Sequence, residues 1–405
     1  MSRKLKILQL SPRFPFPMDD GGKIGIANIL IEFFRQGCEV SFFTFKNEEV
    51  SNASIEELKK YANPVLFAHS TKNTILRIIK SILTNRSIYI NKHSEKKVFN
   101  FFNRLINNIE FDVIHADHTA MAPIAVYLKK LTGKPIGLRL HNIEFMIWKR
   151  YADVLPDYHP KKLYIQHQAN LLKNYESNVY NKFDICFPIT EVDKQKALAL
   201  SPNSKQIVAG PGIDDLYWFP DDNVERNPVE LIIATVFSWK HNLDGLIWFI
   251  KNVLPILRKQ NPQIKLSVIG KDIPDYLRNY KNEGVNVIGY VDDVRPYLNK
   301  AGIYIVPLFV GSGIRIKIIE AMAMKLPVLA TSVAAEGINA KNENGLIICN
   351  STNEFSEKIM ELTKKPDLIM ELGDNARKFS MANFSWKSNV NIMVENYKKL
   401  AILNI

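Results

Sequence analysis

Short apolar runs alternate with segments of helical periodicity along most of the chain. The first unit is an apolar run over residues 5–11, a loop, and then apolar positions three and four apart over residues 24–35. Further runs of strand length cover residues 39–45, 65–68, 112–117, 135–141 and 184–189. Strands that alternate with helices are typical of a parallel sheet covered by helices. The sequence therefore predicts an α/β protein.

The alternation starts again after a polar stretch. Residues 213–228 contain prolines and have no periodicity, which is typical of a linker. Later runs of strand length cover residues 229–236, 265–270, 285–289, 303–308 and 327–332. We predict doubly wound domains over residues 1–212 and 229–380, joined by the linker 213–228. Residues 381–405, which hold a helix, are expected to cross back to the first domain.

A glycine-rich loop near the end of the second domain is the strongest candidate for a ligand site. The apolar run 303–308 leads to Gly311, Ser312 and Gly313, and helical periodicity follows over residues 314–324. The first N–H groups of a helix lack partners within the helix, and the helix dipole adds partial positive charge there. The loop therefore predicts an anion site.

Two cations strengthen that prediction. Arg315 and Lys317 fall in the first turn of the predicted helix, where the dipole disfavours positive side chains unless an anion is present. Glu320 follows Lys317 by three residues and shares its helix face. The segment favours a phosphate group as the ligand, while a surface helix with a lysine–glutamate pair stays open as the alternative.

Histidines and carboxylates stand where two strands of the first domain end. His115, Asp117 and His118 lie at the end of one predicted strand, and His141 and Glu144 follow the next. Ligands of open parallel sheets bind outside the carboxyl ends of the strands. These side chains are therefore candidates for substrate contact, although a single histidine in such a place is more often structural.

Residues 72–108 form a basic amphipathic segment with two predicted helices. Apolar residues recur three and four apart, and lysines and arginines surround them. Such a segment can lie on an anionic membrane. It can equally be a pair of helices whose apolar face is core and whose charges face solvent.

Composition limits the classes of partner. The 405 residues are 46% hydrophobic and 23% charged, as in folded globular proteins, and the net charge is +12. Such a charge favours nucleic acid, an anionic membrane surface or phosphorylated small molecules. No nucleic-acid-binding motif is visible in the sequence, so we expect no nucleic acid partner. Cys38, Cys186 and Cys349 are far apart, which argues against disulfides and a metal site.

The apolar runs are too short to cross a bilayer, and the first residues lead into a strand without the apolar region of a cleavable signal. We therefore expect a cytoplasmic protein. The membrane alternative would place it at the inner face of the membrane.

Five stretches resemble one family across nearly the whole chain. They are RFPFPMDDGGK, DVIHADH, LRLHNIE, FSWKHN and GSGIRIKIIEAMAMKLPVLATSVAAEGI, of which the last is the most specific. Together they resemble the nucleotide-sugar glycosyltransferases of the retaining family 4, or glycosyl transferases group 1. The resemblance implies the GT-B fold, in which two Rossmann-like domains face a central cleft and the second binds the nucleotide-sugar.

The resemblance also implies roles for particular residues. Glu320 would hold the nucleotide ribose, and Arg315 would stabilise the leaving diphosphate. The residues that it places around the donor are Gly21, Gly22, Lys240, Gly311, Ser312, Gly313, Ile314, Arg315, Lys317 and Glu320. Ser312 stands where the better-known signature has its first glutamate, so contacts to the donor sugar must come from elsewhere.

On the acceptor side, the resemblance implies that His118 or Asp117 lines the sugar site and that His141 and Glu144 contact the acceptor. Retaining members are thought to react without a protein nucleophile. No DxD motif is present, and cationic side chains can replace a divalent ion at the diphosphate, so no metal or other cofactor is expected.

The resulting hypothesis is an enzyme that moves a hexose-type sugar from a UDP- or GDP-sugar to a glycan or lipid-linked glycan, as in bacterial surface polysaccharide or glycoconjugate assembly. Two alternatives stay open: a catalytically silent GT-B partner subunit, suggested by Ser312, and a sugar-nucleotide epimerase.

Overall fold

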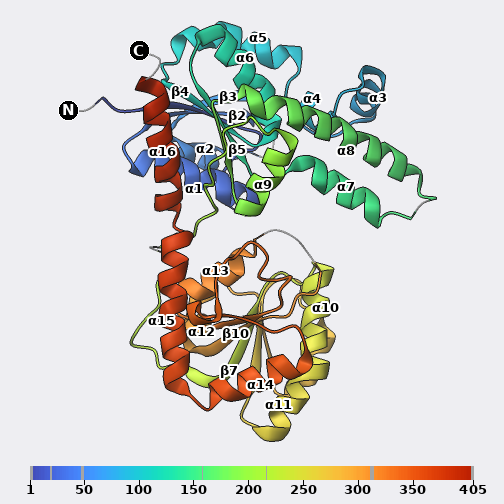
Figure 1. Cartoon of the computed structure of the whole chain (residues 1–405), viewed down its shortest axis with the longest axis vertical. Coiled ribbons are helices and arrows are strands. Elements are labelled where there is room, and N and C mark those ends of the chain that lie inside the picture. Colours follow the sequence, from blue (N-terminus) through green and yellow to red (C-terminus); the bar gives the residue numbers. More distant parts are fainter. Residues whose placement is uncertain are drawn as a thin grey trace. The chain divides into compact units, whose positions relative to one another are not determined.

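The computed structural model describes residues 3–18, 21–46, 50–156, 158–215, 217–310 and 314–402. The chain forms two compact units (Figure 1). Unit 1 contains Met1–Pro211 and Trp386–Ile405, and unit 2 contains Gly212–Ser385. Each unit is an α/β structure with one parallel sheet of six strands, in agreement with the predicted fold class.

Unit 1 is built on a sheet with the strand order β3-β2-β1-β4-β5-β6. Its strands are β1 (Lys6–Ser11), β2 (Glu39–Lys46), β3 (Asn63–Ala68), β4 (Val113–Asp117), β5 (Ile136–Leu140) and β6 (Ile185–Pro188). All neighbouring strands run parallel. Strand order reverses between β1 and β4, so the carboxyl ends of these strands are the expected place for a ligand.

Helices cover both faces of this sheet. They are α1 (Gly21–Arg35), α2 (Asn52–Lys59), α3 (Ile75–Thr84), α4 (Ile88–Asn91), α5 (Lys96–Leu105), α6 (Ala122–Thr132), α7 (Glu144–Val154), α8 (Pro160–Val179), α9 (Glu191–Leu200) and α16 (Trp386–Ile402). One core packs α5 and α6 on the sheet, and the other packs α1 and α16 on its opposite face. Apolar side chains of the strands are thus buried on both faces, as in other parallel sheets covered by helices.

Helix α16 brings the end of the chain into unit 1 (Figure 1). The hydroxyl of Tyr397 lies 2.6 Å from Nδ1 of His115 on β4. A side chain at Gly137 on β5 would overlap the Tyr397 ring. The missing side chain at Gly137 therefore leaves the space that lets α16 pack closely on the sheet.

Unit 2 repeats the architecture with the strand order β12-β11-β10-β7-β8-β9. Its strands are β7 (Asn227–Ala234), β8 (Lys265–Ile269), β9 (Val285–Gly289), β10 (Ala301–Val306), β11 (Val328–Ala330) and β12 (Leu346–Ile348). Its helices are α10 (Lys240–Trp248), α11 (Leu254–Gln260), α12 (Arg295–Lys300), α13 (Ile316–Ala323), α14 (Thr352–Thr363) and α15 (Pro366–Asn383). Order reverses between β7 and β10, so their carboxyl ends flank the second expected ligand position.

The predicted linker, residues 213–228, packs on unit 2 instead of bridging two bodies. Ile213 is buried in a core of unit 2, and the guanidinium of Arg377 donates to the carbonyl of Trp218. The boundary near the C-terminus also lies later than predicted, because Phe384 still packs in unit 2 and unit 1 resumes at Trp386. Apolar residues within a polar stretch explain both differences, since burial of a few large side chains outweighs local polarity.

Among the described residues, no helix combines the length and the apolar character that a bilayer crossing requires. Cys38, Cys186 and Cys349 are buried free thiols.

Candidate functional site

In unit 2, the predicted phosphate element runs from β10 to α13. Gly311, Ser312 and Gly313 lie outside the described residues, so the path of the loop is not part of the site geometry. Ile314 and Arg315 precede α13, whose N-cap is Arg315 with no side-chain cap bond. The N–H groups of the first turn therefore open toward the end of β10, where an anion would be favoured.

Lys317 is the most constrained cation of this element. Its Nζ lies 3.0 Å from Oγ1 of Thr235, which follows β7, and 3.1 Å from Oδ1 of Asn242 on α10. Burial, and then the charge of Arg315, lowers the pKa of Lys317 to about 7. Two neutral acceptors thus fix the position of the ammonium, while burial disfavours its positive charge. A nearby anion would stabilise the charged form.

Glu320 lies one turn further along α13. Burial raises the pKa of its carboxyl to about 7, although Lys317 opposes the shift. Tyr304 on β10 is a neighbour of Glu320. Burial, and then the charge of Glu320, raises the pKa of its phenol. Near neutral pH the Glu320 carboxyl can therefore both donate and accept hydrogen bonds, which suits contact with hydroxyl groups.

Lys240 does not join this cluster. Its side chain is 85% exposed and pairs with Asp244 one turn along α10, at 2.8 Å. The position at the end of β7 that the resemblance gave to Lys240 is reached by Lys317 from α13. The sequence pattern missed this because the two segments are far apart along the chain.

Two further neighbours were not predicted. Thr235 bonds Lys317, and His241 lies close enough to Arg315 and Lys317 that, after burial, their charges lower its pKa. Thr235 carries no sequence signal beyond its place after a strand. His241 could have been found, because it falls within the FSWKHN stretch that opens unit 2.

In unit 1, the strand-end residues form a buried polar cluster. Oδ1 of Asp117, at the end of β4, lies 2.7 Å from Nε2 of His141 and 3.5 Å from Nη1 of Arg139 on β5. Gln9 on β1 donates to its other oxygen at 3.2 Å. Asp117 is fully buried, so it cannot line a sugar site, and its contacts instead orient His141. Burial would raise the pKa of Asp117, but His141 and Arg139 together lower it below its usual range.

His118 stands beside this cluster in a rare backbone conformation. Its φ is 80°, which side-chain-bearing residues seldom adopt, and its ring centroid lies 3.5 Å from that of His141. Burial, and then His141, holds the pKa of His118 well below its usual range. Strain of this kind persists where the surrounding structure determines the position of a functional side chain. His118 is partly exposed, unlike Asp117.

The same three side chains have the spacing of metal ligands. Ligand atoms of Asp117, His118 and His141 all lie within 4.8 Å of one another. However, the Arg139 guanidinium contacts both Asp117 and His141. A permanent cation in contact with two of the three groups already neutralises the carboxylate and repels a metal ion, so the cluster fits an ordered hydrogen-bond network better.

The first turns of α1 approach this network. The helix begins at Gly21, so Gly21 and Gly22 belong to its first turn and not to the loop before it, where the sequence placed them. At Gly25, a side chain would meet His141 and Arg139 at 3.3 and 3.4 Å. A small residue at Gly25 therefore lets the helix N-terminus lie close to the strand-end cluster.

Glu144 belongs to a separate buried group. It is 8% exposed, and burial and the neighbouring Glu176 raise its pKa to about 7. Glu176 on α8 accepts the backbone N–H groups of Glu144 and Phe145 at 2.9 and 3.0 Å, and the Tyr180 hydroxyl at 2.6 Å. The Glu176 carboxyl thus fixes the start of α7, while the Glu144 side chain is buried beside it and does not present its carboxyl to an acceptor.

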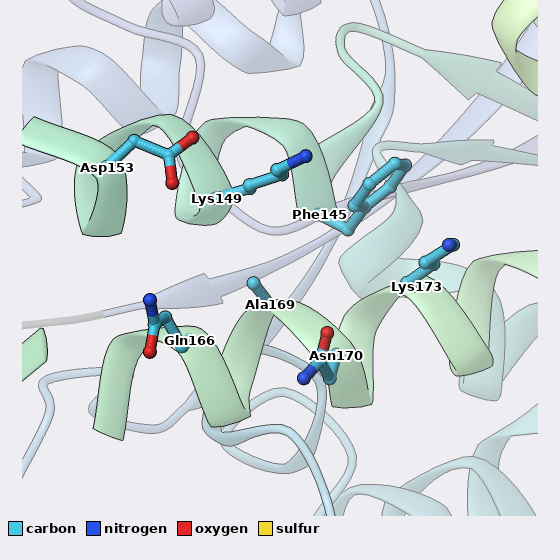
Figure 2. A pocket seen from close by; sticks show the side chains of 7 residues that line it. All are labelled: Phe145, Lys149, Asp153, Gln166, Ala169, Asn170 and Lys173. Carbon is cyan, nitrogen blue, oxygen red and sulfur yellow. The ribbon is translucent and has the colours of Figure 1, made fainter. Parts of the chain in front are cut away.

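A cavity of about 330 Å³ begins immediately after Glu144, between α7 and α8. Figure 2 shows side chains of the two helices facing each other across it. They are Phe145, Lys149 and Asp153 from α7, and Gln166, Ala169, Asn170 and Lys173 from α8. An aromatic ring, two carboxamides and charged groups suit a polyhydroxylated ligand. Sequence reasoning missed this cavity because α7 itself was not predicted.

Comparison with known proteins connects this geometry with a family. Residues 230–365 match the family model described as glycosyl transferases group 1. An uncharacterized 44.6 kDa protein in the cps region of Klebsiella pneumoniae is 24% identical over 400 residues, covering 94% of this chain and 97% of that protein. An uncharacterized glycosyltransferase of Methanocaldococcus jannaschii is 25% identical over 239 residues, which are 55% of this chain and 59% of that one.

Solved structures share the whole two-unit architecture. Sucrose-phosphate synthase from Thermosynechococcus elongatus superposes with a TM-score of 0.68 at 15% identity, covering 98% of this chain and 99% of that one. HepE from Anabaena, solved in complex with UDP, gives a TM-score of 0.62 at 13% identity over 98% and 100% of the two chains. The predicted fold is confirmed: the chain has the GT-B fold of these structures, and residues 230–365 of its second unit are similar to glycosyl transferases group 1.

Proposed function

We propose that the protein moves a hexose-type sugar, with retention, from a UDP- or GDP-sugar to a glycan or lipid-linked glycan acceptor. Assembly of a bacterial surface polysaccharide or glycoconjugate is the proposed setting. The observation that carries the proposal is Lys317, whose ammonium is fixed by Thr235 and Asn242 at the opening of α13.

The Lys317 arrangement supports diphosphate binding for an electrostatic reason. When the sugar leaves, negative charge grows on the diphosphate, and fixed cations stabilise that charge more strongly than the starting state. Arg315 and the first N–H groups of α13 act in the same direction. We therefore propose that these groups take the part that a divalent ion plays elsewhere, so that no metal is required.

Ribose recognition is proposed for Glu320, whose carboxyl titrates near neutral pH. The choice between UDP and GDP stays open, and HepE, which was solved with UDP, makes UDP the first nucleotide to test. On the other side of the reaction, we propose His118 for contact with the donor sugar, since Asp117 is buried behind it.

For the acceptor, we propose the cavity between α7 and α8 in place of Glu144. Phe145 offers a ring face, and Gln166 and Asn170 offer carboxamides to sugar hydroxyls. Lys149 and Lys173 would favour an acceptor that carries an acidic group.

The test is a panel of UDP, GDP and their sugars, read first as the rise in melting temperature and then as nucleotide release with and without acceptor. A transferase binds one nucleotide and releases it faster with acceptor. An epimerase would return an isomer of the donor without acceptor, and a silent partner subunit would release no nucleotide. No stabilisation by any nucleotide would reject the donor site itself.

A further inference from the structure

Helix α3 of unit 1 exposes its apolar face. The exposed fractions of Ile75, Leu76 and Leu83 are 76%, 79% and 79%, and those of Ile79 and Ile82 are 48% and 52%. With 3.6 residues per turn, these five side chains occupy an arc of about 120° on the helix. A surface helix of a folded protein normally turns this arc toward the core.

The polar side of α3 is the side that packs on unit 1. Ser81 is buried, donates to the carbonyl of Arg86 at 2.8 Å and accepts from Nε2 of Gln168 on α8 at 2.7 Å. Arg77 donates twice to Oε1 of Glu95, at 2.7 and 3.0 Å. Because these contacts fix the rotation of the helix, its apolar arc is held outward. Figure 1 shows α3 at the margin of unit 1, next to α4.

Cations are concentrated beside the exposed arc. A cavity of about 180 Å³ lies between α3 and the following segments, and its charged lining residues are Arg77, Lys80, Arg86, Lys92, Lys96 and Glu95. Glu95 is already engaged by Arg77. Burial and then the Arg77 charge lower the pKa of Lys92. The cavity therefore has an excess of positive charge that an anionic oxygen group would relieve.

We propose that α3 docks on an anionic lipid bilayer, with Ile75, Leu76, Ile79, Ile82 and Leu83 between the acyl chains and the neighbouring cavity holding a lipid phosphate. An apolar face bordered by lysine and arginine is the composition of helices that lie in the membrane interface. A protein interface fits less well, since lysine is depleted where proteins meet.

The location has a consequence for the acceptor. Helix α8 contacts α3 through Gln168, and its other side lines the α7–α8 cavity through Gln166 and Asn170. Docking would thus hold one helix of the proposed acceptor site near the bilayer surface. That consequence rests on the proposed function, whereas membrane binding itself does not.

The test is cosedimentation of the full chain with vesicles of phosphatidylcholine alone or mixed with phosphatidylglycerol. We expect binding to the mixed vesicles, weakened by added salt because screening shortens the range of the attraction. The double variant Leu76→Asn, Leu83→Asn should bind at least about tenfold more weakly, since it removes two inserted side chains. The matched control is Leu131→Asn, an exposed leucine on α6, which should bind like the wild type.

Charge is tested separately. Lys80→Glu and Arg86→Glu should each weaken binding about fivefold or more, because each cation near an anionic surface contributes about that factor. Lys130→Glu, an exposed lysine on α6, carries the same change of charge and should have a smaller effect. Unchanged melting temperatures identify the variants as folded.

Several results would overturn the proposal. One is equal binding to both vesicle types, and another is an equal loss in the α3 variants and their controls. A rise in melting temperature with inorganic phosphate and no vesicle binding would mean a free-phosphate site instead. A concentration-dependent dimer that the α3 variants abolish, again without vesicle binding, would mean a second copy as the partner. The rise in melting temperature with nucleotide reports on the donor site and does not depend on membrane binding. The α3 variants should therefore retain that rise.

Discussion

The ammonium of Lys317 lies within hydrogen-bond distance of both Thr235 and Asn242, although the three residues come from three different segments of unit 2. This contact joins the end of β7, the start of α10 and the start of α13 at one point. A negatively charged ligand at that point would meet a cation whose position is already determined, so little ordering is needed on binding.

Replacement of Lys317 by methionine should weaken UDP or GDP binding by about 1.5 to 3 kcal/mol, the range for a hydrogen bond to a charged group. Isothermal titration calorimetry of the preferred nucleotide measures this. The control is Lys240→Met, which removes an exposed lysine already paired with Asp244 and should leave the affinity nearly unchanged. Equal losses in the two variants would place the diphosphate elsewhere.

Donor binding should depend on pH near neutrality. The pKa of Lys317 is lowered to about 7 in the free protein, so the side chain is charged below pH 7 and neutral above it. A bound diphosphate raises that pKa, and the affinity for the sugar nucleotide should therefore fall as the pH rises from 7 to 9, by at most about tenfold per unit.

The variant Lys317→Arg separates the two groups that titrate in this range. Its guanidinium stays charged, so any slope that remains belongs to Glu320, whose ionisation above pH 7 adds repulsion. A slope in Lys317→Arg as steep as in the wild type would contradict the assignment to Lys317.

Glu144 should make unit 1 less stable as the pH rises. Its pKa in the folded protein, about 7, lies above the unfolded value near 4.5, so the folded state holds the extra proton and stability falls from pH 4.5 to pH 7. Glu144→Gln removes this loss and should be more stable than the wild type by about 2 kcal/mol at pH 8, with little difference at pH 4.5. Urea unfolding at the two pH values measures it.

The exposed Glu371→Gln on α15 serves as the control for that experiment and should change stability little at either pH. A Glu144→Gln protein that is less stable at pH 8 would mean that the carboxylate is stabilised by contacts that outweigh its burial.

Removal of divalent metal should leave donor binding and transfer unchanged. Arg315 and Lys317 supply positive charge at the diphosphate, and Arg139 occupies the one histidine–carboxylate cluster that has metal-ligand spacing among the described residues. The measurement is activity after EDTA treatment and dialysis, with added Mg²⁺, Mn²⁺ or Zn²⁺ as the comparison. A tenfold loss restored by one of these ions would contradict the expectation.

The alternation of strands and helices was predictable from the sequence, because both sheets are parallel and their strands are continuous apolar runs. Helix α7 was not. It begins three residues after His141 and mixes aromatic, charged and apolar side chains, so no single face stands out. The cavity between α7 and α8 depended on that helix and could not be foreseen.

Site residues were predictable by region but not by role. The strand-end rule brought Asp117, His118 and His141 to one place, as the structure has them. It could not tell that Asp117 is buried or that Glu144 faces Glu176, because burial depends on neighbours from distant segments. For the same reason, the sequence could not tell that Lys317, and not Lys240, contacts the residue that follows β7.

The return of α16 also determines when unit 1 can be completed. Tyr397 fills the space above Gly137 and bonds His115, yet it is synthesised only after every residue of unit 2. Unit 1 therefore cannot be completed before unit 2 has been synthesised, although N-terminal domains usually fold first. Unit 2 is the first to have all of its residues available. A premature stop before residue 386 would keep every proposed site residue of both units and would remove only the closing helix of unit 1.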